Sequence, residues 1–139
     1  MDINANIITQ NIKQEERYLI ALVESKKIAF SARWIQDILV FTRSQVLELP
    51  FYSQSLLGVL HHQNQIIPLV SGHHIFSEQT SHISQTTLTA LRLNQLGKKL
   101  AGVGVVVDRM VQSISHSELG KEKLFQLTDI PQSIWLPQR

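Results

Sequence analysis

The chain contains no cysteine among its 139 residues, and this absence excludes two kinds of chemistry. Disulfide bonds and thiolate metal sites both need cysteine sulfur. The chain also has no apolar run approaching the ~20 residues that a membrane-spanning helix requires. Its first residues lack the basic segment followed by a long apolar one that marks a secretory signal. We therefore expect a cytoplasmic protein that does not insert into a membrane.

Clustered charge is scarce as well. The sequence has 13 Lys and Arg residues against 11 Asp and Glu residues, a formal net charge of +2. Its lysines lie in scattered pairs such as Lys26 and Lys27 or Lys98 and Lys99, and they form no dense block. A surface that follows a nucleic-acid backbone needs many phosphate contacts side by side. We expect no nucleic-acid partner.

The motifs of common enzymes are missing too. There is no Gly-x-Ser-x-Gly nucleophile elbow, no Gly-x-Gly-x-x-Gly and no phosphate loop. Gly102 and Gly104 are too closely spaced for a nucleotide motif and fall inside a predicted strand. Asp108 follows that strand and can orient a histidine, although an aspartate at a strand end is more often a turn or capping residue. These observations predict a protein without catalysis or a cofactor.

Six histidines raise the possibility of a metal site, which the spacing disfavours. His61 and His62 are adjacent, as are His73 and His74, and adjacent strand residues point to opposite faces of a sheet. No carboxylate occurs from residue 49 to residue 77, whereas zinc sites often include one. We expect turn or surface histidines and no metal; one histidine from each pair is the first combination to test.

Short strands separated by turns dominate the rest of the pattern. Residues 18–23 and 28–30 predict a hairpin, and residues 38–41 and 87–93 predict further strands. A valine-rich segment from residue 100 to 114 predicts one long strand, and residues 124–130 a last one. No long helical pattern competes, so the sequence predicts an all-β barrel or sandwich. Residues 1–17 form a polar lead-in, for which a short amphipathic helix and a frayed tail both remain open.

Residues 55–71 are the most informative stretch. Two apolar runs flank a polar centre at residues 61–65, as in a β-hairpin. Asn64 is the best turn residue, because a short amide side chain tolerates positive φ. Gly58 predicts a bulge or a close backbone approach. Pro68 has no N–H group, so the second strand should be an edge strand or locally unpaired there.

Four segments in this order resemble the CheW-like domain family, the adaptor of bacterial chemosensory arrays. Ile35-Gln-Asp-Ile38 is similar to a family segment Val-x-Glu-Val/Ile, and Pro50 follows in an extended stretch. Gly58-Val-Leu-His-His-Gln-Asn-Gln-Ile-Ile-Pro-Leu-Val-Ser71 is similar to Gly-Val-x-Asn-Leu-Arg-Gly-x-Val-Ile-Pro-Val-x-Asp-Leu. Gly104-Val-Val-Val-Asp-Arg-Met-Val111 is similar to Gly-x-x-Val-Asp-x-Val. The order and spacing match from about residue 18 to residue 114.

The resemblance implies an all-β fold of two small five-stranded barrel-like halves, with the CheW-like domain at residues 18–139. It implies a non-catalytic adaptor that bridges a methyl-accepting-type chemoreceptor and the regulatory domain of a CheA-type histidine kinase, in chemotaxis or type IV pilus motility. In the family, a groove between the halves usually takes the receptor and an apolar strand surface takes the kinase.

The resemblance also implies a set of partner-binding residues, at Asp37, Gly58, Val59, Gln63, Asn64, Ile66, Pro68 and Asp108. Four positions depart from the family pattern, and at one of them the family's aspartate after Ile-Pro-Val-x is Ser71 or absent. Gln63 stands where the family has an arginine, and an amide cannot form its bidentate, charge-assisted pair. Asn64 replaces the turn glycine, and Arg109 replaces an acidic residue. The changes at Gln63 and Arg109 predict an altered choice of partner.

The C-terminal region is short for the family. Either residues 124–130 are its final strand after a deletion, or the second half of the fold is incomplete. Both cases leave a strand edge that can pair with a partner or with a second copy of the chain. Two other functions remain open: a regulatory or assembly protein that reuses the CheW fold for other protein partners, and an enzyme that uses the histidine cluster.

Overall fold

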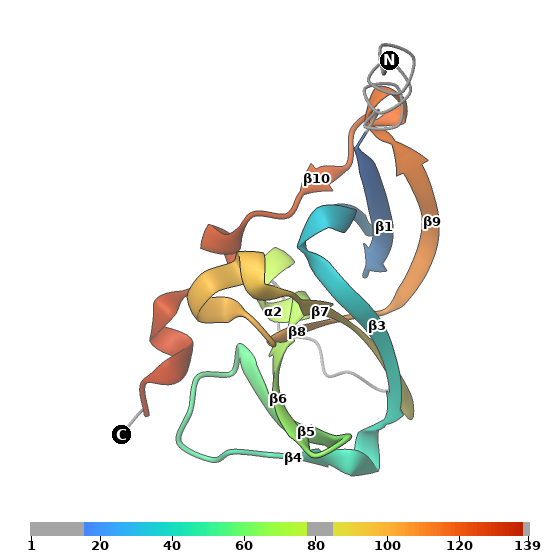
Figure 1. Ribbon diagram of the computed structural model, residues 1–139. Coiled ribbons are helices and arrows are strands. Elements are labelled where there is room, and N and C mark those ends of the chain that lie inside the picture. Colours follow the sequence, from blue (N-terminus) through green and yellow to red (C-terminus); the bar gives the residue numbers. More distant parts are fainter. Residues whose placement is uncertain (1–15, 78–84, 138–139) are drawn as a thin grey trace, which may run out of the picture.

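The computed structural model describes residues 16–77 and 85–137. The helix considered for the lead-in at residues 1–17 lies outside these residues up to residue 15. Two sheets make up the described structure (Figure 1). The prediction of an all-β protein in two small halves is confirmed, and the strands divide four and six between the sheets rather than five and five.

The four-stranded sheet has the order β10-β2-β1-β9. Its strands are β1 (Arg17–Val23), β2 (Lys26–Ser31), β9 (Arg109–Ser115) and β10 (Lys123–Leu124). β1 and β2 form the predicted first hairpin, with Glu24 at a φ of 56° in the turn. β10 runs parallel to β2, and β9 runs antiparallel to β1.

The six-stranded sheet has the order β3-β7-β8-β6-β5-β4. Its strands are β3 (Ile35–Thr42), β4 (Val46–Leu47), β5 (Leu56–His62), β6 (Gln65–Ser71), β7 (Thr87–Leu93) and β8 (Gly104–Val107). The sheet curls from β3 round to β4 (Figure 1). In the described part of the chain β3 and β4 are not hydrogen-bonded neighbours, so the curl does not close into a barrel.

Helical structure is limited to short pieces. The one α-helix among the described residues is α2 (Gly72–Phe76), which directly follows β6. The 3₁₀ turns are η1 (Ala32–Trp34), η2 (Arg43–Gln45), η3 (Gln95–Leu100), η4 (His116–Glu118), η5 (Leu127–Asp129) and η6 (Gln132–Trp135).

Three clusters of buried apolar side chains stabilise the two sheets. The largest lies between them and joins residues such as Val23 and Phe30 of the first sheet to Leu91 and Val105 of the second. A second fills the inside of the six-stranded curl, with Leu39, Phe41, Leu60, Ile67, Leu69, Leu88, Ala90 and Val106. A third, smaller cluster contains Tyr18, Ile20, Ala29 and Ile114. β8 separates the first two clusters and is buried along its whole length, which explains its unbroken valine run.

Two predicted strands were wrong in extent. The long strand expected at residues 100–114 is two strands, β8 and β9, which belong to different sheets and meet at Asp108. Its first predicted residue, Leu100, belongs to η3 instead, and β8 begins only at Gly104. The last predicted strand, residues 124–130, is strand only at β10, and η5 follows. An apolar run shows that a segment is buried, but it does not reveal the point where the chain changes sheets.

The central hairpin is confirmed in detail. Gly58 sits at a register shift in β5 with a φ of +150°. Gln63 and Asn64 both have positive φ, 49° and 64°, as a two-residue hairpin turn requires. Pro68 lies in an interior strand, but the pairing of β6 with β8 begins only at Leu69. The missing N–H of Pro68 therefore falls where β8 does not reach.

The bulge at Gly58 gives a direct test of the fold. A Cβ at this position would lie 2.3 Å from the carbonyl oxygen of Leu47, where β4 meets β5. Gly58→Ala should therefore lower the free energy of unfolding by about 2–4 kcal/mol, measured by urea denaturation. Gly120→Ala is the control, because its Cβ meets only the Glu122 side chain at 3.8 Å. Equal stability of the two variants would contradict the close contact.

Candidate functional site

The outer face of strands β4, β5 and β6 carries an apolar surface. Leu47 is the cross-strand partner of Val59, and Val59 is the partner of Pro68. Ile66 lies two residues from Pro68 and therefore on the same face. Leu47 and Ile66 are 65% and 61% exposed, while Val59 and Pro68 are half-buried. We call these four residues the outer strand face.

This surface unites three of the predicted partner-binding residues, Val59, Ile66 and Pro68. The intervening residues Leu60 and Ile67 point the other way, into the cluster inside the curl. Alternation along paired strands thus places apolar side chains on both faces, one covered by protein and one not. Leu47 was not predicted from the sequence, because only the register of β4 against β5 places it on the same face as Val59, Ile66 and Pro68.

The turn between β5 and β6 lies next to this face. Gln63 and Asn64 occupy its two central positions and are both exposed. Gly58, in contrast, is buried in the bulge, and its backbone lies against Leu47. Gly58 therefore shapes the outer strand face without presenting a side chain to a partner.

Asp37 belongs to a polar group around the buried Arg92, at the same end of the curl. The Arg92 guanidinium donates to both carboxylate oxygens of Asp37, from Nε at 2.8 Å and from Nη2 at 2.5 Å. Its Nη1 donates to the Gln65 side-chain oxygen at 2.9 Å. Arg92 is only 5% exposed. We call Asp37, Gln65 and Arg92 the Arg92 group; it joins β3, β7 and β6 through side chains.

The Arg92 group lies over the end of the core inside the curl. Asp37 precedes Leu39 and Phe41 on the inward face of β3, and Arg92 follows Ala90 on the inward face of β7. A bidentate pair of this kind fixes the strands relative to each other and leaves no buried charge without a partner. The sequence signal for Arg92 was a charged residue at an inward position of an apolar strand.

Asp108 lies elsewhere, beyond the opposite end of β6 from the turn. Its Oδ2 accepts a hydrogen bond from the Glu24 backbone N–H at 2.6 Å, and its Oδ1 lies 2.5 Å from His73 Nε2. The second ring nitrogen of His73 lies 3.4 Å from the Glu24 carboxylate. The structure therefore does not bring Asp108 together with the outer strand face. Asp108 serves as a turn acceptor and orients a histidine.

The remaining histidine contacts are also local. His74 Nδ1 lies 2.8 Å from the Ser55 hydroxyl, and its backbone N–H donates to the Ser71 hydroxyl. Within residues 16–77 and 85–137, no three His, Asp or Glu side chains converge as a metal site would need. Over the same residues, no helix is both long and apolar enough to cross a membrane.

Comparison with known protein families identifies the family of this chain. The model of the CheW-like domain matches residues 17–134, which is most of the chain. The chain belongs to the CheW-like domain family. No curated protein matches its sequence.

A solved CheW structure has the same fold. The scaffolding protein TtCheW from Thermoanaerobacter tengcongensis superposes with a TM-score of 0.62 at 13% sequence identity. The superposition covers 73% of this chain and 66% of that chain, just under two thirds of its length. At this identity the likeness establishes the fold alone.

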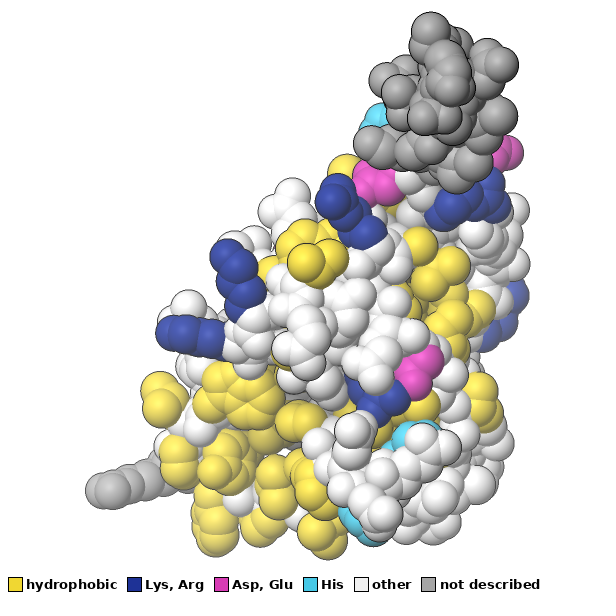
Figure 2. Space-filling model, in the orientation of Figure 1, with side chains coloured by type: hydrophobic (Ala, Val, Ile, Leu, Met, Phe, Trp, Pro, Cys, Tyr) yellow, Lys and Arg dark blue, Asp and Glu magenta, His cyan; other side chains and the backbone are white. Residues whose placement is uncertain are grey.

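A second exposed apolar surface of this CheW-like domain lies near its C-terminus. Figure 2 shows hydrophobic side chains gathered where the β4–β5 connection and η6 lie. The exposed residues there are Phe51, at 75%, Leu136, at 63%, and Trp135, at 38%. Ile134, the neighbour of Trp135, is fully buried.

The Arg92 group predicts an asymmetric response to mutation. Asp37→Ala leaves a buried guanidinium with one remaining acceptor, and should lower the free energy of unfolding by about 3 kcal/mol. Arg92→Met leaves a half-exposed carboxylate that water can reach, and should lower the free energy of unfolding by only about 1 kcal/mol. Urea denaturation of both variants and of the double variant measures the coupling.

The double variant Asp37→Ala/Arg92→Met is the internal control. It should be more stable than Asp37→Ala alone, because no unpaired buried charge remains. If Asp37→Ala lowered the free energy of unfolding no more than Arg92→Met does, burial of the Arg92 guanidinium would not require its pairing with Asp37.

Proposed function

We propose that this protein is a non-catalytic adaptor that bridges a chemoreceptor and the regulatory domain of a CheA-type histidine kinase, in chemotaxis or type IV pilus motility. The observation that carries the proposal is the CheW-like domain match over residues 17–134. The superposed relative is itself named a scaffolding protein, which supports the same role.

The outer strand face is the proposed kinase surface. It presents four apolar side chains on paired strands, with a packed core directly behind them. A rigid, exposed apolar surface is typical of a protein-binding site, since little order is lost when a partner covers it. Among the predicted residues, Val59, Ile66 and Pro68 would make the direct contacts, and Gly58 would hold β5 against β4.

The turn at Gln63 and Asn64 is the proposed receptor contact, together with the neighbouring Asp37. Both turn side chains are exposed amides that donate and accept hydrogen bonds without carrying a charge. Asp37 is already bound to Arg92, so a partner would approach a neutral ion pair rather than a free carboxylate. Asp108 would support partner binding only indirectly, by stabilising the fold.

Bridging of this kind acts by mass action. A protein that holds a receptor and a kinase at once raises the concentration of each near the other, without a chemical step. The role thus requires two surfaces that can be occupied together. The outer strand face and the turn lie side by side on one hairpin, so partners of moderate size would also touch each other.

Binding of the kinase domain should depend on Ile66. Ile66→Lys places a charge in the outer strand face, and should weaken binding to a CheA-type regulatory domain about tenfold, measured by isothermal titration calorimetry. Leu124→Lys is the matched control, because Leu124 is 44% exposed on the other sheet. Absence of binding by the unmodified protein at about 50 μM would count against the adaptor role and favour other protein partners.

Receptor binding should depend on the uncharged turn. Gln63→Glu adds a negative charge beside Asp37, and should reduce retention on an immobilised chemoreceptor cytoplasmic fragment several-fold while leaving kinase binding unchanged. Gln112→Glu is the control, an exposed amide on β9. Equal retention of both variants would move the receptor contact away from the turn.

A further inference from the structure

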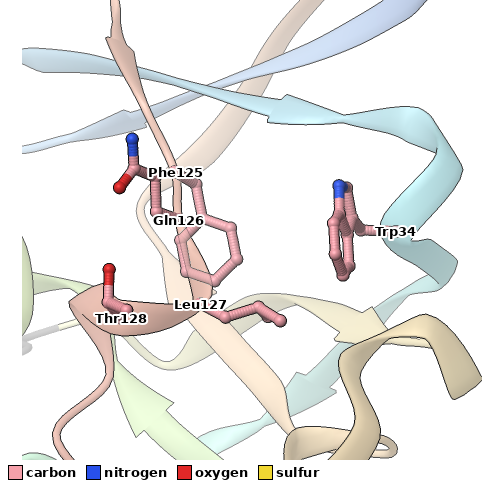
Figure 3. A pocket seen from close by; sticks show the side chains of 5 residues that line it. All are labelled: Trp34, Phe125, Gln126, Leu127 and Thr128. Carbon is pink, nitrogen blue, oxygen red and sulfur yellow. The ribbon is translucent and has the colours of Figure 1, made fainter.

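A recess lies apart from the outer strand face, between η1 and the segment that follows β10. Its volume is about 370 Å³, and its lining residues are Trp34, Phe125, Gln126, Leu127 and Thr128. Figure 3 shows the Trp34 ring on one side, facing Phe125 and Leu127 on the other. The recess thus has apolar walls, with an amide and a hydroxyl group at its margin.

The walls of the recess are held in place by the fold. The Trp34 carbonyl accepts a hydrogen bond from the Asn94 N–H at 2.9 Å. The Phe125 N–H donates to the Ala29 carbonyl at 2.9 Å, and the Phe125 ring stacks on Phe30 with centroids 4.8 Å apart. A recess whose walls are already fixed loses little freedom when an apolar group enters it.

Charged side chains of both signs lie near the recess in the chain. Arg33 directly precedes Trp34 in the chain, Lys123 lies two residues before Phe125, and both are exposed. Each already has an acidic neighbour: Arg33 lies 3.4 Å from Glu16, and Lys123 lies 3.3 Å from Asp129. The pKa of Glu16 is lowered, chiefly by the hydrogen bond that the Tyr18 hydroxyl donates to it.

Two further lysines have no such neighbour. Lys98 and Lys99 of η3 are exposed, and within the described residues no carboxylate forms a salt bridge with either. η3 adjoins the recess, because Asn94 at its start binds the Trp34 carbonyl and Leu100 at its end packs on the same core as Trp34. Figure 2 shows Lys and Arg side chains over η3 on this side of the molecule.

The backbone at Lys98 is strained. Its φ of 55° and ψ of −112° fall in a region that favours glycine, yet the glycine is the preceding residue, Gly97. Backbone strain of this kind occurs at binding sites, where the side chain or its direction is needed. Here the strained backbone presents a lysine beside an apolar recess.

We propose that this recess binds a short acidic segment of a partner protein, with one large apolar side chain between Trp34 and Leu127 and with Asp or Glu residues against Lys98 and Lys99. The apolar walls exclude a charged group from the interior, while the unneutralised lysines favour an anion at the margin. The inference does not depend on the proposed function, since it concerns different elements of the fold.

The two tryptophans of the chain provide the assay. In a Trp135→Phe background Trp34 is the only tryptophan, so its fluorescence reports directly on the recess. The probe is the peptide Gly-Asp-Glu-Leu-Asp-Glu-Gly. The controls are a peptide with Lys at the four acidic positions and an acidic peptide with Ser in place of Leu. Only the first should give a saturable change, and salt should weaken its binding.

Charge reversal at Thr128 gives a matched pair of variants. Thr128 is exposed and lines the recess, so both substitutions should fold. Thr128→Glu should weaken binding of the acidic peptide about threefold, and Thr128→Lys should strengthen it about threefold. Lys98→Gly should weaken binding while raising the midpoint of urea unfolding, because glycine relieves the strain. Lys121→Gly, at an exposed position outside the recess, should leave binding unchanged.

Several results would overturn the proposal. These are no saturable change with the acidic peptide, equal binding of the lysine peptide, or identical affinity of the two Thr128 variants. A concentration-dependent dimer in sedimentation that the acidic peptide fails to dissociate would also overturn it, because a second copy would then occupy the recess.

Discussion

The two sheets depend on the point at which the chain passes from one to the other. β8 ends at Val107 in the six-stranded sheet and β9 begins at Arg109 in the four-stranded sheet, so Asp108 alone connects them. Its N–H donates to the Leu22 carbonyl, and its carboxylate binds the Glu24 N–H and His73. Asp108 thus ties the β1–β2 turn and α2 to the crossing, and these contacts orient the halves around their shared core.

The outer strand face is exposed because the six-stranded sheet supplies its own core. β8 is covered on one side by the cluster between the sheets and on the other by the cluster inside the curl. The curl turns the inward side chains of β3, β5, β6 and β7 toward each other, so no further layer is needed on the outside. Strand alternation then leaves Leu47, Val59, Ile66 and Pro68 uncovered.

Local features of the fold follow from the sequence, and distant pairings do not. The turn at Gln63 and Asn64, the bulge at Gly58 and the strand β7 each have a cause within a few residues, so sequence patterns predict them. Asp37 and Arg92 are 55 positions apart, and only the register of β3 against β7 makes them partners. The passage between the sheets at Asp108 cannot be predicted in the same way, because the segment from Val103 to Ile114 has the composition of one continuous strand and its change of sheet is decided by tertiary packing.

The same register gives Asp37 a partner that the turn residues do not supply. The resemblance to CheW-like domains implies an arginine at position 63 and an acidic residue at position 37, whereas here the arginine that binds Asp37 comes from β7. Asp37 thus has a cationic partner within the fold, and Gln63 in the turn is uncharged and exposed. Under the proposed adaptor role, specificity at this end of the molecule would come from hydrogen bonding and from the shape of the outer strand face, rather than from a charged contact at the turn.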